Sequence, residues 1–324
     1  MSPDLPAPLR GALDRALEGA PRKDLAQRAA RTSQAYRAGR ASSGVIREAD
    51  DALAYALTRL PATYAACATV LAEAARMAPG FAPKTLLDAG AGTGAASWAA
   101  AQVWPALADV TWLDASAPFL TLAAQLAAHG PPVLRAAEAR RGDLTAAGPW
   151  PGAELVVASY VLAEIASDRQ TSVINELWAA CEGLLALVEP GSPAGYARLL
   201  AARTVLFGQG ATIVAPCSHQ AACPLVGQDW CHFSVRLPRS RDHRLAKGGE
   251  VPFEDERFAY LIAARPGIAV APYRPRVLAP LRMGKAGIAL KLCALDAKVE
   301  PRLINKRDTA AYAAARRLGW GDTF

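Results

Sequence analysis

The feature that most constrains the fold is a glycine-rich turn between an apolar strand and an alanine-rich helix. The apolar residues 85–87 lead into Asp88-Ala-Gly90-Ala-Gly92-Thr-Gly94, and AASWAAAQVW follows as a predicted helix. Gly90 and Gly92 let the backbone turn sharply and approach a ligand, and Gly94 lets the helix pack close to the strand. Such a strand–turn–helix unit predicts a cofactor at the carboxyl end of a parallel strand.

Strands and helices alternate through residues 81–265. We expect further strands at residues 109–113, 133–137, 155–158, 183–188, 211–215 and 258–264. This rhythm predicts a doubly wound, parallel α/β sheet with ligands at the carboxyl ends of its strands. Residues 1–80 are predicted to be a helical region, in which Pro61 separates two helices, and residues 266–324 a basic, β-rich segment. The chain is thus expected to have three parts, with a cysteine-rich insertion at 216–250.

Two more carboxylates extend the glycine motif. Asp114 ends the second predicted strand about 20 residues after the last glycine, where a carboxylate binds ribose hydroxyls. Nicotinamide-binding proteins share this logic, so a nicotinamide cofactor remains an alternative. The pattern Asp-x-Gly-x-Gly-x-Gly, however, resembles the first motif of class I S-adenosylmethionine-dependent methyltransferases. That resemblance implies that Asp88 is an acid on the cofactor side, Asp114 binds the ribose, and Asp143 lies beside the adenine amino group; the alternative for Asp143 is a turn residue.

The sequence after the fourth predicted strand has no base-methylating signature. Residues 158–164, ASYVLAE, stand where Asn/Asp-Pro-Pro-Tyr/Phe would lie. Cys181 is predicted to lie in a helix, away from any strand end, so no cysteine nucleophile is evident. Tyr160 and Glu164 are the remaining polar candidates for catalysis. For Tyr160, a place in the lining of the cofactor pocket is favoured over a catalytic role. A methyl transfer would then depend on positioning alone, and whether the chain is an enzyme stays open.

The charge is concentrated in the last part of the chain. Residues 196–324 hold 20 Lys and Arg against 10 Asp and Glu, whereas residues 1–195 hold 16 against 19. A basic half indicates a polyanionic partner such as RNA or DNA, or a solvated basic surface. No apolar run approaches the ~20 residues of a membrane span, and the start lacks a signal-peptide layout. We therefore expect a cytoplasmic protein, where clustered cysteines indicate metal binding rather than disulfides.

Three cysteines lie in one irregular stretch, APCSHQAACPLVGQDWC. Cys217, Cys223 and Cys231 punctuate a segment that predicts neither a helix nor a strand, so a metal or an iron–sulfur cluster would supply its order. Zinc is the alternative to iron–sulfur, and a histidine could replace a thiolate; the candidates are His219, His232 and His243. The cations that follow are spaced too irregularly for one helix face and indicate a loop that meets phosphates. They are Arg236, Arg239, Arg241, Arg244 and Lys247.

Four segments together carry a family resemblance. The resemblance runs from about residue 40 to the end of the chain. Its segments are, in chain order, APCSHQAACPL, WCHFSVRLPR, FEDERFAYL and KRDTAAYAAARRLGWGD. They resemble the small-ribosomal-subunit-associated methyltransferase-like family of bacteria and mitochondria. The resemblance implies a class I methyltransferase fold that binds S-adenosylmethionine in residues 81–265, and association with the small ribosomal subunit and its rRNA. It also implies a [4Fe–4S] cluster on Cys217, Cys223, Cys231 and Cys293.

Further expectations concern partners and activity. We expect no membrane partner and a monomer when the protein is free. The alternative function is an active S-adenosylmethionine-dependent methyltransferase of rRNA or a ribosomal protein, with a structural zinc site.

Overall fold

The large sheet of the computed structural model has the parallel core that the sequence predicts. The structure describes residues 4–37, 42–146 and 148–324. In this part of the chain the strand order is β3-β2-β1-β4-β5-β8-β6, and β7 pairs with β8. The bounds are β1 (Thr85–Ala89), β2 (Asp109–Asp114), β3 (Glu138–Arg141), β4 (Ala153–Ser159), β5 (Cys181–Pro190), β6 (Thr212–Ala215), β7 (Phe233–Pro238) and β8 (Phe253–Ala264). Strands β1 to β5 run parallel, and β8 is antiparallel to β5, β6 and β7.

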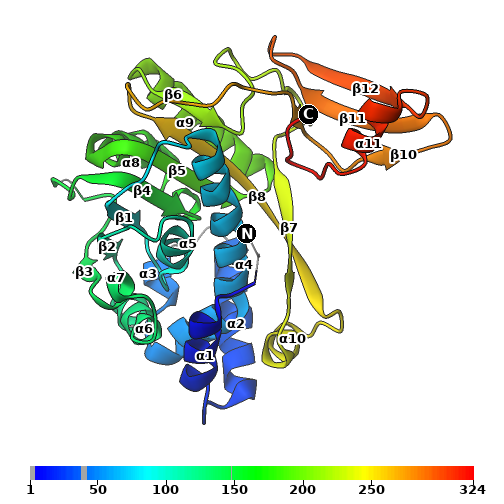
Figure 1. Cartoon of the computed structure of the whole chain (residues 1–324). Coiled ribbons are helices and arrows are strands. Elements are labelled where there is room, and N and C mark those ends of the chain that lie inside the picture. The colour runs from blue at the N-terminus through cyan, green and yellow to red at the C-terminus, as the bar shows by residue number, and fades with distance from the viewer. Residues whose placement is uncertain (1–3, 38–41, 147) are drawn as a thin grey trace.

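Helices cover both faces of this sheet (Figure 1). The α-helices that precede β8 in this part of the chain are α1 (Ala7–Ala16), α2 (Arg22–Arg37), α3 (Ser42–Val45), α4 (Ala49–Met77), α5 (Ala95–Val103), α6 (Ala117–Ala127), α7 (Pro132–Arg135), α8 (Ser167–Ala180), α9 (Pro193–Gly208) and α10 (Arg241–Lys247). Of these, α1, α2, α3 and α10 pack mainly on other helices rather than on the sheet. Alternate residues of β5 face opposite layers: Leu184 packs in the core cluster that includes α4 and α5, and Leu185 in the one that includes α8 and α9. A strand buried on both faces reads as a continuous apolar run. The result is a class I methyltransferase-like α/β fold, as predicted.

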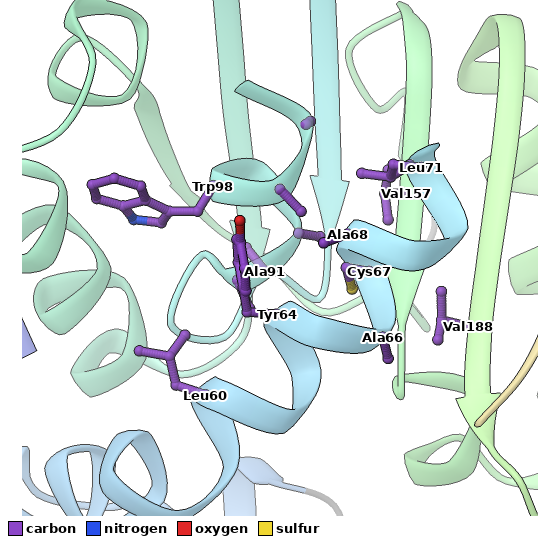
Figure 2. Close-up of a cluster of buried hydrophobic side chains, with 14 of the residues drawn as sticks. Leu60, Tyr64, Ala66, Cys67, Ala68, Leu71, Ala91, Trp98, Val157 and Val188 are labelled. Atoms are coloured by element: carbon purple, nitrogen blue, oxygen red, sulfur yellow. The ribbon is translucent and has the colours of Figure 1, made fainter. Parts of the chain in front are cut away.

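Helix α4 is continuous through Pro61, so the expected division into two helices is wrong. A proline inside a helix costs about 3 kcal/mol because it removes a backbone donor and crowds the preceding turn. Leu57, Leu60 and Tyr64 on either side of Pro61 are nearly fully buried. Each such side chain contributes about 1.5–3 kcal/mol, which together outweighs the proline. Figure 2 shows Leu60, Tyr64 and Leu71 of α4 in the core that also contains Trp98.

Two other expectations are wrong, one at the edge of the sheet that β3 forms and one at Cys181 in the centre of the sheet. Residues 132–135 form the short helix α7, and the strand predicted at 133–137 is instead β3. All four residues of β3 are exposed, so its sequence lacks the apolar alternation by which strands are predicted. Cys181 is the first residue of β5, not a helical residue. It is buried among apolar neighbours.

The last part of the chain forms a second, antiparallel sheet with the order β10-β11-β12, in which β9 also pairs with β11. The strands are β9 (Arg276–Val277), β10 (Arg282–Met283), β11 (Gly287–Cys293) and β12 (Val299–Asn305). Helix α11 (Thr309–Ala315) packs on one face over Ile288, Leu290 and Ile304. Figure 1 shows this sheet set to one side of the large one, far from α10. Across the described ranges, no helix is both long and apolar enough to cross a membrane.

Leu71 tests the packing of α4 on the sheet. Its side chain is fully buried, so we expect Leu71→Ala to lower the free energy of unfolding by about 2–5 kcal/mol, because it leaves a cavity. Leu303→Ala is the control: Leu303 is 55% exposed, and its loss should cost less than about 0.5 kcal/mol. Urea unfolding followed by circular dichroism measures both. Equal effects of the two substitutions would contradict the buried position of Leu71.

Candidate functional site

The glycine loop lies at the carboxyl edge of the sheet, directly after β1. Gly90, Gly92 and Gly94 have φ angles of 74°, 54° and 79°, a region that residues with a side chain rarely adopt. A Cβ atom at Gly90 would lie 2.7 Å from a methyl carbon of Val161, whereas one at Gly92 would meet no atom within 4 Å. The loop is therefore packed against protein at Gly90 and faces open space at Gly92, where a ligand can approach the backbone.

Asp114 fixes the shape of this loop from the end of β2. Its Oδ2 accepts a hydrogen bond from the Gly92 backbone N–H at 2.8 Å, and its Oδ1 accepts one from the Ser116 N–H at 2.8 Å. Burial raises the pKa of the Asp114 carboxyl, and these two hydrogen bonds oppose that shift. Each oxygen keeps a further lone pair. The sequence-predicted ribose acid is thus held against the loop, with acceptor capacity left for hydroxyl groups.

Asp88 lies behind the loop and is fully buried. Its Oδ2 accepts hydrogen bonds from the backbone N–H of Ser97 at 3.1 Å and from its hydroxyl at 2.7 Å, while Trp112 Nε1 donates to that hydroxyl oxygen at 3.0 Å. Its Oδ1 has no partner in the described part of the chain. Burial raises the pKa of Asp88 from 3.8 to about 7, with the nearby Asp114 adding to the shift. Asp88 therefore joins β1, β2 and α5, and direct contact with a cofactor stays a prediction.

Asp143 follows β3 on the same edge and is exposed. Its Oδ1 accepts hydrogen bonds from the backbone N–H and the hydroxyl of Thr145, both at 2.8 Å. This is the turn geometry that Asp side chains commonly form. Contact with an adenine amino group remains a prediction for this residue.

Tyr160 directly follows β4 and has a strained backbone. Its φ of 62° costs on the order of 1–3 kcal/mol for a residue of this size. The strain is held by two hydrogen bonds: its N–H donates to Val188 O at 2.7 Å, and its hydroxyl donates to Glu256 Oε1 at 2.9 Å. Arg59 of α4 also bonds Glu256, at 3.0 and 3.3 Å. Burial raises the pKa of the Tyr160 phenol well above its usual value, and the Glu256 carboxylate adds to this.

A cavity of about 1170 Å³ adjoins Tyr160. It is lined by residues of α2, α4 and α10 and by the segments that follow β4 and β5. Its polar lining includes Thr32, Gln34, Tyr55, Arg59, Tyr160 and Glu164. The two catalytic candidates from the sequence, Tyr160 and Glu164, thus line one cavity at the edge of the sheet where β4 and β5 end.

The four cysteines that the family resemblance selects line a second cavity, of about 50 Å³. Cys217, Cys223 and Cys231 come from residues 216–232, which form neither helix nor strand, as the sequence predicts. Cys293 ends β11 of the second sheet and pairs with Arg276 of β9. The volume exceeds the roughly 10–15 Å³ that one water needs. The fold therefore brings together thiols that lie up to 76 residues apart in the chain.

These thiols are close together but do not form a finished ligand cage. In residues 4–37, 42–146 and 148–324, no group of three or more His, Cys, Asp or Glu is placed to hold a metal ion. Burial, with neighbouring thiols adding to it, raises the pKa of Cys231 well above its usual value and that of Cys293 to about 11. Binding a metal would therefore release protons.

Of the three histidines that were candidate ligands, His219 lines the thiol cavity, and its Nε2 lies 3.5 Å from Cys293 Sγ. His232 stacks on Trp230 with ring centroids 5.0 Å apart. His243 lies on α10, with its Nε2 3.2 Å from Glu254 Oε2. The structure therefore leaves His219 as the histidine beside the thiols.

Arg276 connects the thiol cavity to the rest of the protein. Its buried guanidinium donates to Pro216 O at 2.9 Å, to Gly321 O at 2.8 Å and to Glu73 Oε1 of α4 at 2.6 Å. Trp230 Nε1 donates to Gly191 O at 3.1 Å, so the cysteine segment is also bonded to the turn after β5. These contacts set the position of the cysteine segment relative to the large sheet.

The five predicted RNA-binding cations lie on β7, on α10 and between them, so the expected loop is wrong. Strand β7 is held by pairing with β8 along its whole length. Arg236 forms a two-bond ion pair with Asp255 at 2.7 and 2.8 Å, and Arg239 and Lys247 both bond Glu254. Arg241 is exposed and Arg244 half-buried. Three of the five cations therefore have carboxylate partners, and contact with RNA stays a prediction for all five.

Sequence reasoning missed the residues that support the two sites. Glu256 and Arg59 lie 197 residues apart, and no local pattern connects them with Tyr160. Tyr196 and Arg203 of α9 line the thiol cavity, but on a helix they read as ordinary polar positions. The one available signal was that Arg203 lies in an apolar stretch of α9, between Leu199 and Leu206.

Comparison with known proteins shows which family the chain resembles. The model of the family described as "Mitochondrial small ribosomal subunit Rsm22" matches residues 49–324. The human protein "Ribosome assembly protein METTL17, mitochondrial" is 29% identical over 287 residues, 83% of this chain and 61% of the human protein. The "Rsm22-cox11 tandem protein 2, mitochondrial" of Schizosaccharomyces pombe is 27% identical over 215 residues, 52% of this chain and 29% of that protein. This chain thus spans less than two thirds of the length of either relative.

Solved structures resemble the fold at low identity. A putative RNA methyltransferase, PH1948 from Pyrococcus horikoshii, is 10% identical with a TM-score of 0.40, covering 62% of this chain and 81% of that one. Magnesium protoporphyrin IX methyltransferase from Synechocystis, with bound SAH, is 19% identical with a TM-score of 0.42, covering 63% and 83%.

The buried carboxyl of Asp88 predicts a pH dependence of stability. With its pKa raised from 3.8 to about 7, the folded chain holds a proton that the unfolded chain loses at lower pH. This contribution to the free energy of unfolding is therefore full below pH 4 and falls as the pH rises to 7, by at most about 4 kcal/mol. Asp88→Asn should remove it. Urea unfolding between pH 5 and 8, taken as the difference between the two proteins, measures the effect; an unchanged slope would contradict the burial of the carboxyl.

Proposed function

The chain belongs to the Rsm22 family, and from this premise we propose that it is an S-adenosylmethionine-binding, methyltransferase-like protein that associates with the small ribosomal subunit and acts in ribosome assembly. The observation that carries the proposal is the glycine loop held against Asp114 at the carboxyl edge of a class I methyltransferase-like sheet. The family match and the names of the relatives support the ribosomal part.

The loop suits S-adenosylmethionine in two respects. Gly92 faces open space, so a ligand can approach its backbone, and Asp114 has acceptor positions left for ribose hydroxyls. The cofactor supplies an electrophilic methyl group when it is bound. Gly90, Gly92, Gly94 and Asp114 would hold it, with Asp88 supporting the loop from behind and Asp143 at the exposed end.

The large cavity is the proposed site of a methyl acceptor. It lies after β4 and β5, at the edge of the sheet where β1 ends and the glycine loop begins. The Tyr160 phenol, with its raised pKa, stays protonated at neutral pH and cannot accept a proton, and its own proton is donated to Glu256. Glu164 and Glu254 are carboxylates on the same lining, and Glu254 is ion-paired with Arg239 and Lys247. Any transfer here would rest chiefly on positioning the acceptor, so we place assembly ahead of catalysis in the proposal.

We assign the thiol cavity to a [4Fe–4S] cluster held by Cys217, Cys223, Cys231 and Cys293. Four cysteines around one cavity, Cys293 buried and the other three half-buried, are the donor set that iron–sulfur clusters use. A cluster there would supply a redox centre and would join the cysteine segment to the second sheet through Cys293. The alternative is an active methyltransferase of rRNA or a ribosomal protein with structural zinc at the same thiols, since four thiolates also suit zinc.

The second sheet offers cations for an rRNA contact. Arg282, Lys306 and Arg307 are exposed, and among the described residues they have no carboxylate within ion-pair distance. Unpaired cations contribute fully to phosphate binding, unlike Arg236, Arg239 and Lys247. The cellular compartment stays a prediction, because both relatives are named as mitochondrial proteins whereas the sequence led us to expect the cytoplasm.

Asp114→Asn tests cofactor binding. Replacing the carboxylate should weaken S-adenosylmethionine binding at least about tenfold, because hydrogen bonds to a charged group contribute about 1.5–3 kcal/mol. Titration calorimetry measures it. Asp109→Asn is the matched control at the opposite, exposed end of the same strand and should bind as the wild type does. Equal affinity of all three proteins would overturn the assignment of this edge.

The same variant separates the two functions. We would compare small-subunit assembly by sucrose-gradient sedimentation, and rRNA and ribosomal-protein methylation by mass spectrometry, in cells that carry Asp114→Asn. If a methyl group and small-subunit assembly are lost together, the enzyme is favoured. If assembly depends on the protein but the methylation of rRNA and ribosomal proteins is unchanged, the assembly factor is favoured.

Cys231→Ser tests the thiol site. Removal of one of four ligands should lower bound metal to a small fraction of the wild-type content and loosen the cysteine segment, since metal binding is coupled to folding. Iron, sulfide and zinc analysis after anaerobic purification measures the content. Cys67→Ala is the control, because Cys67 is buried in α4 and is not part of the cavity. Unchanged metal in Cys231→Ser would show that the site is assigned wrongly.

A further inference from the structure

Arg203 is a buried cation without an anion. Its residue is 7% exposed on α9, yet in the described part of the chain it has no carboxylate within ion-pair distance. Its Nη2 donates to Gln220 O at 3.1 Å and Ala221 O at 2.6 Å, and its Nε has no partner. The side chain lines the thiol cavity.

Among the described residues, the other arginine that is nearly fully buried is Arg276, and it bonds the Glu73 carboxylate at 2.6 Å. A buried charge that lacks a counter-ion costs several kcal/mol. Two backbone carbonyls reduce that cost for Arg203, but they carry no net charge. An anion in the cavity that Arg203 lines would supply the counter-charge that the described side chains do not.

We propose that Arg203 is the counter-cation of an anionic metal–thiolate group on the four cysteines. The inference rests on the thiol site of the proposed function. Four thiolates around one divalent metal, or around an iron–sulfur cluster, carry net negative charge next to this guanidinium. Arg203 also bonds the backbone of residues 220 and 221, between Cys217 and Cys223, so it fixes the segment that presents two of the ligands.

Two neutral donors complete the surroundings of the sulfurs. The Tyr196 hydroxyl lies 3.2 Å from Cys223 Sγ, and His219 Nε2 lies 3.5 Å from Cys293 Sγ. A metal-bound thiolate has no proton to give, so the tyrosine and the histidine act as donors in these two contacts. His219 is thus a hydrogen-bond donor to a ligand sulfur rather than a ligand. Donors and charges around the sulfurs set both metal retention and the reduction potential of a cluster.

Arg203→Gln removes the charge, and Arg203→Lys keeps it while losing the planar fork. Arg265→Gln is the matched control, because Arg265 likewise donates to two backbone carbonyls, of Cys181 and Trp178, but lies outside the thiol cavity. Each protein, spanning residues 1–324, is reconstituted anaerobically with iron and sulfide. Iron, sulfide and zinc per chain are measured, then the half-time of metal release to EDTA and, where iron is bound, the reduction potential.

We expect Arg203→Gln to release metal about 10–100 times faster than the wild type and to shift the cluster potential to more negative values. Arg203→Lys should lie between the two, and Arg265→Gln should release metal as the wild type does. Wild-type retention and potential in Arg203→Gln would overturn the proposal, as would equal losses in Arg203→Gln and Arg265→Gln. Zinc in the wild type would overturn the assignment of an iron–sulfur cluster but not the role of Arg203 as counter-cation. The rate of zinc release from Arg203→Gln would then test that role. A wild type that holds no metal would overturn both.

Discussion

The buried guanidinium of Arg276 is the contact on which the arrangement of the parts depends. It bonds the carbonyl before Cys217, the carbonyl of Gly321 near the C-terminus and the Glu73 carboxylate of α4. Because Arg276 is also paired with Cys293 in the second sheet, one side chain connects three chain segments around the thiols. Its Glu73 partner supplies the counter-charge for this buried guanidinium.

Helix α9 lies between the two candidate sites. Ser192, Ala194 and Arg198 at its start line the large cavity, whereas Tyr196, Leu199 and Arg203 line the thiol cavity. The buried Glu189 at the end of β5 bonds Arg198 at 2.6 Å, which fixes the helix to the large sheet. Helix α9 therefore contributes side chains to both the thiol cavity and the proposed acceptor site.

The sequence pattern was sufficient to predict structure where the residues of a short segment decide it. The apolar strands at 85–87 and 183–188 could be predicted because a strand covered on both faces must be apolar throughout. The glycine loop could be predicted because only glycine adopts its positive φ angles without strain. Strand β3 could not, since its exposed residues are held by pairing with β2, and neither could the continuity of α4, since burial on both sides of Pro61 outweighs the cost of the proline.

The sequence by itself determined the sheet class, the cofactor loop with Asp114, and, through the family resemblance, the four cysteines. The sheet class and the glycine loop rest on residue chemistry and spacing within short segments, whereas Cys293 was joined to the other three cysteines by the family resemblance alone. Only the tertiary structure decided that Tyr160 is strained and bonded to Glu256, that most of the predicted RNA-binding cations on β7 and α10 are paired with carboxylates, and that Arg203 has no carboxylate partner among the described residues. These features depend on side chains from distant segments meeting in space, and whether a charge is paired, buried or free is a property of the fold rather than of any stretch of sequence.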